Sequence, residues 1–261
     1  MAVFSLPSRV AYRLAIAGLV VLAASGTVFF AQRIQSRADT TAIRAAANSD
    51  ARHGRLYHAI SGFEQLIRRD PDDADAWQRV GLLYRATGQL GRSWDALAEA
   101  ARLNPHDYLS RTALGMLGPH LGRLTESDTM LRQVLQSDPG NADALTAHAS
   151  LTIRLDPSSQ GLKLAEQEVD RAIRARKSGP AYDTRGQVHR AQRRFKDAIQ
   201  DFKDAIAVEP RARSHYLFLS QSYAASGDST MARAAMAQYE NLPRAQQPID
   251  APAGDRAGRT Q

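Results

Sequence analysis

The sequence predicts an all-α fold, an α-solenoid of stacked helical hairpins that follows one apolar N-terminal segment. Marker residues recur at a constant spacing, and a period of roughly 20–50 residues is typical of solenoid proteins. The composition also favours helix over sheet, because Ala, Arg, Leu and Gln dominate while β-branched and aromatic residues are sparse. Together these observations predict one two-helix unit repeated along the chain.

Three kinds of marker residue recur with a period of 34 residues, which is the spacing of Pro71 and Pro105. The prolines stop a helix, the Asp or Asn two residues later suits the N-cap of the next helix, and the glycines suit a left-handed C-cap. The markers are Pro71, Pro105 and Pro139; Asp73, Asp107 and Asn141; and Gly54, Gly88 and Gly122. They predict a unit of helix, turn, helix, turn.

Apolar residues between the markers follow the helical period, and small residues such as Gly81 and Ser93 allow the paired helices to approach closely. The second, third and fifth units show this pattern best. They contain Trp77, Gly81, Tyr84, Leu97, Ala100 and Pro105; Leu114, Gly115, Gly122, Ser127, Leu131, Val134 and Pro139; and Gly186, Ala198, Phe202, Ala205 and Pro210. This pattern resembles the tetratricopeptide repeat. We expect Trp77 and Phe202 to be buried, so that truncating either to Ala costs about 3–5 kcal/mol.

The resemblance implies a right-handed superhelix of six repeats over residues 40–246. The repeats are 40–73, 74–107, 108–141, 142–178, 179–212 and 213–246. In the fourth repeat, the run Asp156-Pro157-Ser158-Ser159 predicts an inserted turn, a longer loop and a local change of pitch. Residues 32–39 are predicted to be a linker. Residues 247–261 are rich in Pro, Gly and polar side chains and are predicted to be a disordered tail.

Residues 14–31 form an uncharged apolar segment after a short tail, residues 1–13. As a helix, this segment spans about 27 Å, close to the hydrocarbon core of about 30 Å. It is predicted to be a transmembrane anchor or a secretory signal cleaved near Ser25, before Gly26. The apolar run Val28-Phe29-Phe30 favours the anchor. Under the first interpretation the repeats face the periplasm from the inner membrane; under the second the chain is periplasmic or secreted.

The net charge of +7 is spread among many carboxylates, apart from a group of arginines around the apolar segment. This distribution indicates solubility and proximity to a membrane, whereas a nucleic-acid reader usually has a concentrated basic stripe. The chain has no cysteine, which excludes disulfides, thiolate zinc sites, thiol nucleophiles and an N-terminal lipid-modified Cys.

Sequence patterns for catalysis and for ligand binding are missing. The seven histidines fall in different units without metal-ligand spacing, and the acidic run 70–75 lacks the Gly and the distal Glu of an EF-hand loop. There is no phosphate loop, dinucleotide fingerprint or nucleophile elbow. We therefore expect no catalytic residue, metal, cofactor or small-molecule substrate.

A stack of such repeats curves, and the first helix of each hairpin lines its concave face. The apolar pattern leaves a mixed set of side chains to point into this groove, and such a surface suits an extended segment or a helix with apolar anchors. The predicted groove residues are Gln78, Leu82, Arg85, Thr112, Met116, Thr146, Ser150, Ile153, Asp183, Gln187, Arg190, Leu217 and Gln221.

The resemblance implies a non-catalytic scaffold that binds a peptide or helix of a partner protein at the cell envelope and assists assembly of a multiprotein complex. One alternative is an accessory subunit that positions an envelope enzyme or a secretion machine. A further alternative is nucleic-acid binding through Arg190, Arg193 and Arg194, which salt-dependent RNA binding would reveal.

Overall fold

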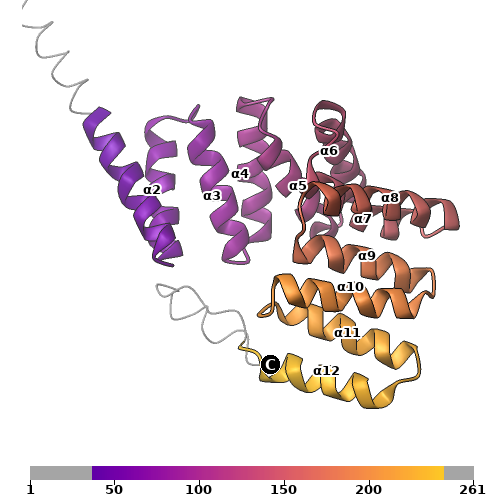
Figure 1. The fold of residues 1–261 in the computed structure, drawn as a ribbon. Coiled ribbons are helices and arrows are strands. Elements are labelled where there is room, and N and C mark those ends of the chain that lie inside the picture. Colours follow the sequence, from indigo (N-terminus) through magenta and orange to yellow (C-terminus); the bar gives the residue numbers. More distant parts are fainter. Residues whose placement is uncertain (1–36, 244–261) are drawn as a thin grey trace, which may run out of the picture.

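The structure, a computed structural model, describes residues 37–243, and all regular structure in this range is helical (Figure 1). A first helix covers residues 37–52. The helices that follow are α2 Leu56–Arg69, α3 Ala74–Ala86, α4 Leu90–Leu103, α5 Tyr108–Leu121, α6 Leu124–Ser137, α7 Ala142–Leu155, α8 Ser159–Ala175, α9 Gly179–Ala191, α10 Phe195–Val208, α11 Arg213–Ala225 and α12 Ser229–Asn241. The predicted all-α class is confirmed.

The predicted N-terminal segments 1–13 and 14–31 and the predicted tail 247–261 lie outside the described residues. Between residues 37 and 243, no helix is both long enough and apolar enough to cross a bilayer.

The helices form consecutive antiparallel hairpins, and each hairpin packs on the one before it. Along the inner face, α5 packs against α7 and α7 packs against α9, while α3 and α5 share little direct contact. Figure 1 shows α2, α3 and α4 standing side by side and α9 to α12 lying across their direction, with the turn made through α5 to α8. This arrangement is a solenoid with an inner and an outer layer of helices.

The predicted caps are present at the starts of the inner helices. The side chains of Asp73, Asp107 and Asn141 are N-caps, and each accepts a backbone N–H bond of 3.0 Å, from Ala76, Ser110 and Ala144 respectively. Such caps satisfy amide groups that have no partner within the helix.

The predicted left-handed turns between paired helices are also present. Gly54, Gly88 and Gly122 have φ values of 73°, 79° and 73°. Only glycine adopts this backbone region without a steric penalty.

Arg193 occupies the corresponding turn between α9 and α10 with a φ of 61°, and it is the one non-glycine residue with positive φ among residues 37–243. We expect Arg193→Gly to stabilise the protein by about 0.5–1 kcal/mol. Glycine relieves a backbone strain of about 1–2 kcal/mol in the left-handed region. The greater conformational entropy of glycine in the unfolded chain cancels part of this gain. Urea unfolding followed by circular dichroism measures this change. Gly88→Arg is the matched control and should be destabilising; stabilisation by both substitutions would contradict the argument.

Paired helices meet where a glycine of the inner helix faces a large side chain of the outer helix. A Cβ placed on Gly81 would lie 2.7 Å from Leu97 Cγ, and one on Gly186 would lie 2.7 Å from Phe202 Cζ. Both Leu97 and Phe202 are fully buried. The predicted role of the small residues in close approach is therefore confirmed for these hairpins.

The first and fourth repeats differ from expectation. Residues 37–39 are helical, although they were assigned to the linker 32–39, because no Gly or Pro interrupts the chain there. In the fourth repeat, Ser158 caps α8 by accepting from Gly161 N, and the connection from α7 is as short as that between α3 and α4. The extra residues lengthen α8 to 17 residues instead of forming the predicted longer loop.

The expectation that Trp77 is buried is wrong. Its indole is only partly covered, and Nε1 donates a 2.8 Å hydrogen bond to the carbonyl oxygen of Pro71 at the preceding turn. Phe202, in contrast, is fully buried. The two residues are therefore no longer expected to contribute equally to stability.

Candidate partner-binding groove

Two adjoining pockets lie on the inner layer of helices, and Met116 of α5 lines both. The first, here called the Leu109 pocket, has a volume of about 300 Å³ and lies between α3, α5 and the start of α7. The second, here called the Asp183 pocket, has a volume of about 240 Å³ and lies between α5, α7 and α9. Together they form the groove considered below.

Eight of the thirteen predicted groove residues line these pockets. Those in the Leu109 pocket are Leu82, Arg85, Thr112 and Met116, and those in the Asp183 pocket are Met116, Thr146, Ser150, Asp183 and Gln187. The structure thus brings together predicted residues from α3, α5, α7 and α9.

The other five predicted residues lie in neither pocket. Gln78 donates from Nε2 to Asp107 Oδ1 at 2.8 Å, and Arg190 donates to Gln221 Oε1 at 2.9 Å. Ile153 packs against the core between α7 and α9. Leu217 is half-buried on α11.

Apolar contact area in the Leu109 pocket comes from Leu82, Leu109 and Met116. Leu109 is 53% exposed and Met116 is 42% exposed, so both present apolar side chains to solvent from α5. Thr112 lies beneath them, only 5% exposed, and its Oγ1 has no hydrogen-bond partner among the described residues. This placement corrects the expectation that Thr112 points freely into the groove.

Asp183 is likewise buried rather than freely exposed. A hydrogen bond of 2.8 Å joins its Oδ2 to Nδ1 of His215 on α11. Burial raises the pKa of the Asp183 carboxyl, and the bond with His215 opposes this effect only in part. Its second oxygen, Oδ1, is buried and accepts no hydrogen bond within the described part of the chain.

Four more polar side chains of the Asp183 pocket have no hydrogen-bonding or ionic partner among residues 37–243: His120 on α5, Ser150 and Arg154 on α7, and Gln187 on α9. His120 and Arg154 are exposed, whereas Ser150 and Gln187 are half-buried. The pocket therefore offers polar groups from three helices that the protein itself leaves unpaired.

Leu109, Asp143 and Pro180 also line the pockets, although they are not among the predicted groove residues. These residues lie one helical turn before Thr112, Thr146 and Asp183 on the same stripe of α5, α7 and α9. Extending the predicted stripe by one turn toward each N-cap would have identified them.

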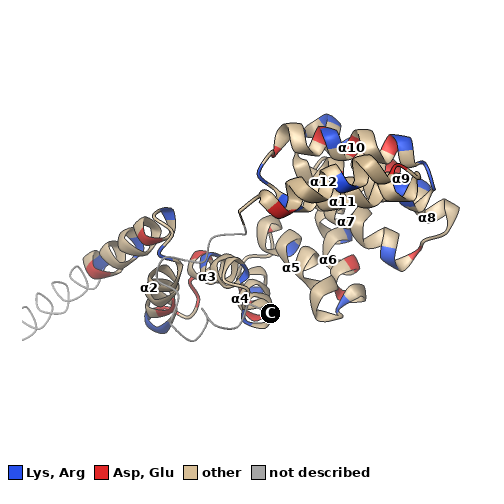
Figure 2. Cartoon of the chain, turned by 90° about the horizontal axis from the view of Figure 1, so that it is seen from below, with Lys and Arg blue, Asp and Glu red and all other residues tan. Residues whose placement is uncertain are grey.

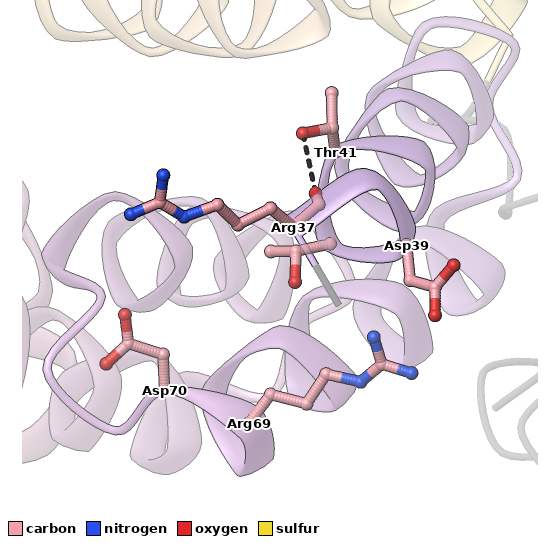
Figure 3. A pocket seen from close by; sticks show the side chains of 6 residues that line it. Arg37, Asp39, Thr41, Arg69 and Asp70 are labelled. Atoms are coloured by element: carbon pink, nitrogen blue, oxygen red, sulfur yellow. Dashed lines mark hydrogen bonds between the residues drawn. The ribbon is translucent and has the colours of Figure 1, made fainter. Parts of the chain in front are cut away.

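A further hollow of about 720 Å³ lies between the first helix and the end of α2 (Figure 3). Arg37 and Arg69 line it together with Asp39 and Asp70, and Thr41 Oγ1 donates to the Arg37 carbonyl at 3.0 Å. It shares no residue with the groove pockets. Two cations and two anions on one open rim select neither sign of ligand, so we assign it no function.

Two buried histidines each contact a carboxylate of their own hairpin through Nδ1 and one of the preceding hairpin through Nε2, which is Asp128 at 3.1 Å for His148 and Glu166 at 3.2 Å for His189. His148 Nδ1 lies 2.7 Å from Glu168, and His189 Nδ1 lies 2.6 Å from Asp201. Burial lowers the pKa of each histidine, but the bonded carboxylates outweigh burial, so both pKa values are raised. No group of His, Asp or Glu in the described range could hold a metal ion.

These pKa shifts predict that stability falls as the solution becomes alkaline. A histidine whose pKa is raised by folding contributes full stability below its unfolded pKa of about 6.5, and this contribution is lost as pH rises through the folded pKa. We expect the melting temperature to drop by a few degrees from pH 6 to pH 9. Scanning calorimetry of His148→Gln and His189→Gln provides the control, because each variant should flatten the slope; an unchanged slope in both would contradict this assignment.

Figure 2 shows basic and acidic segments scattered over the described helices. Of the three arginines in the nucleic-acid alternative, Arg190 and Arg194 are engaged within the chain. Arg194 pairs with Glu166 at 2.8 Å and with Asp197 at 2.7 Å, while Arg190 is bonded to Gln221. These contacts do not favour the nucleic-acid alternative over a protein partner.

Comparison with known proteins yields one family model, described as tetratricopeptide repeat, which matches residues 44–108 and 184–247. Among curated proteins, the chain is similar to DnaJ homolog subfamily C member 3 of Gallus gallus, with 30% identity over 99 residues that cover 38% of this chain and 20% of that protein. The chain spans a fifth or less of the length of the curated relatives it matches.

Solved structures share the fold. The Cut9 and Hcn1 assembly of the APC/C superimposes with a TM-score of 0.70 at 14% identity, over 79% of this chain and 40% of that one. PilW, a type IV pilus biogenesis factor, superimposes with a TM-score of 0.64 at 20% identity, over 80% of this chain and 96% of that one.

Proposed function

We propose that this chain, two segments of which match the tetratricopeptide repeat model, is a non-catalytic adaptor that holds an extended segment of a partner protein in its groove. Proteins of this repeat class generally mediate protein–protein interactions on extended concave surfaces. The observation that supports the proposal most strongly is the pair of adjoining pockets, with Leu109 and Met116 exposed beside unpaired polar groups.

Exposed apolar side chains in a concave setting favour a protein ligand. Leu109 and Met116 lie about two turns apart on α5, and both line the Leu109 pocket. Burying an apolar side chain contributes roughly 1.5–3 kcal/mol, so covering these two residues would supply a substantial part of the binding energy. An extended peptide segment can cover Leu109 and Met116 with one apolar side chain while its main chain forms hydrogen bonds with the groove.

We further propose that the adaptor works at the cell envelope and assists assembly of a multiprotein complex there. Residues 14–31 would anchor the chain in the inner membrane with the repeats in the periplasm, or serve as a signal cleaved near Ser25. The length and apolar character of this segment support the proposal. N-terminal sequencing of the mature chain distinguishes the two versions, since a chain beginning near Gly26 would exclude the anchor.

Site-specific photo-crosslinking in intact cells tests the adaptor proposal. A photoreactive amino acid at position 116 faces the groove, and one at exposed Gln133 on the outer helix α6 serves as the matched control. We expect one partner protein to be captured from position 116 at least about tenfold more than from position 133, and Leu109→Glu to abolish this capture by placing a charge in an apolar contact. Equal capture from both positions would refute the proposal.

A further inference from the structure

We infer that the partner segment presents an apolar side chain to the Leu109 pocket and, close by in its sequence, a neutral amide side chain, Asn or Gln, to the Asp183 pocket. This inference rests on the proposed function and specifies the chemistry of the partner. It depends on polar groups of the two pockets that have no partner among the described residues, and on the opposite charges of Asp183 and Arg154.

The wall of the Asp183 pocket contains an acceptor without a donor. Asp183 is 8% exposed, and only its Oδ2 is engaged, by His215. Oδ1 is buried without a hydrogen bond from any described residue. A buried acceptor without a donor is unfavourable, so an N–H group of a ligand is the complement that this oxygen lacks.

The edge of the same pocket carries donors without an acceptor. Arg154 is exposed there and forms no ion pair with another described residue, and a guanidinium has donors only. Ser150, Gln187 and the exposed His120 also line the pocket, and each can donate or accept. The pocket therefore requires a group that donates at Asp183 and accepts at Arg154.

A primary amide fits this pattern because it carries two N–H donors and a carbonyl acceptor on one planar group. A lysine or arginine of the partner would meet the like charge of Arg154, and a glutamate or aspartate would meet the carboxyl of Asp183. A charged side chain is thus attracted by either Asp183 or Arg154 and repelled by the other, whereas the neutral amide can hydrogen-bond to both.

The Leu109 pocket adds an independent observation. Thr112 Oγ1 is buried below its apolar lining and has no partner in the described chain. A main-chain amide of an extended segment lying over α5 would supply one. Because Met116 lines both pockets, the two anchoring side chains belong to nearby residues, and in an extended strand residues i and i+2 face the same side. The expected motif is an apolar residue separated by one position from Asn or Gln.

Selection of random nonapeptides displayed on phage against the full-length purified chain tests this motif. We expect enriched peptides to contain an apolar residue next but one to Asn or Gln. Synthetic versions of one enriched peptide with Gln, Lys or Glu at the second position should then differ in fluorescence anisotropy titrations, with the Gln version binding at least about tenfold more tightly.

Matched variants locate the effect. Gln187→Ala removes a pocket side chain that has no partner among the described residues, so the variant protein should still fold. This variant should bind the Gln peptide over the Lys peptide with a preference reduced several-fold. Gln221→Ala removes the same type of side chain at the corresponding position of α11, outside both pockets, and should leave the preference unchanged. Asp183→Leu should abolish the preference, while Asp183→Asn, which keeps a carbonyl acceptor, should retain most of it.

The outcomes separate this inference from the proposed function. Peptides that bind and are lost with Leu109→Glu but show no amide preference would overturn the inference and leave the groove function standing. Tighter binding of the Lys or Glu peptide than of the Gln peptide would also overturn the inference and leave the groove function standing. Absence of any enriched peptide, or binding that survives Leu109→Glu, would overturn the groove function and the inference with it.

Discussion

Phe202→Ala should lower the free energy of unfolding by about 3–5 kcal/mol. The ring is fully buried in a cluster that joins α10 to α11 and α12 and includes Leu219 and Tyr223. Truncation removes its transfer free energy and leaves a cavity that the rigid glycine contact at Gly186 cannot fill. Urea denaturation followed by circular dichroism measures the change.

Trp77→Ala is the matched comparison, because it truncates an aromatic residue of another repeat that is only partly buried. We expect it to cost about 1–2 kcal/mol, since less apolar area is returned to water. A loss for Trp77→Ala as large as that for Phe202→Ala would show that burial does not set the energetics of this stack.

Asp201→Ala should be comparably destabilising, by about 3–5 kcal/mol, because it removes one member of a buried charged network. The carboxylate is 4% exposed, with Oδ1 bonded to Arg185 Nη2 at 2.7 Å and Oδ2 to His189 Nδ1 at 2.6 Å. Without it, Arg185 keeps only Asp170 and His189 keeps only Glu166, both of which are more exposed than Asp201. Thermal unfolding monitored by circular dichroism reports the loss.

Asp204→Ala is the control on the same helix. Asp204 accepts only from exposed Gln200, at 2.9 Å, so its removal should change stability by less than about 0.5 kcal/mol. Equal effects at positions 201 and 204 would point to helix propensity or net charge as the cause, not to the network.

The repeated architecture could be predicted from sequence because its determinants are local. An N-cap such as Asp73 acts on residues within one turn, and Gly88 fixes the backbone at its own position. The backbone conformation at each marker residue therefore depends on the local sequence and can be predicted without the rest of the chain. Arg193 shows the limit of this approach, because the hairpin forms its left-handed turn there without the expected glycine.

The groove could be predicted only in outline. Helical periodicity identified the stripe that carries Met116 and Gln187, but it could not show that Asp183 turns into a bond with His215 of the next hairpin. Contacts between hairpins, such as that of His189 on α9 with Glu166 on α8, depend on the rotation between successive units. No single-repeat pattern encodes that rotation.

The scarce contact between α3 and α5 has a mechanical consequence for the whole molecule. These hairpins are joined mainly by the cluster around Trp94, Leu97 and Leu114, while the inner helices are linked directly by the hydrogen bond from Gln78 to Asp107. Because few contacts oppose bending at this junction, we expect bending of the solenoid to change the width of the Leu109 pocket most. The contacts of α5 with α7 and of α7 with α9 should keep the width of the Asp183 pocket more nearly constant during such bending.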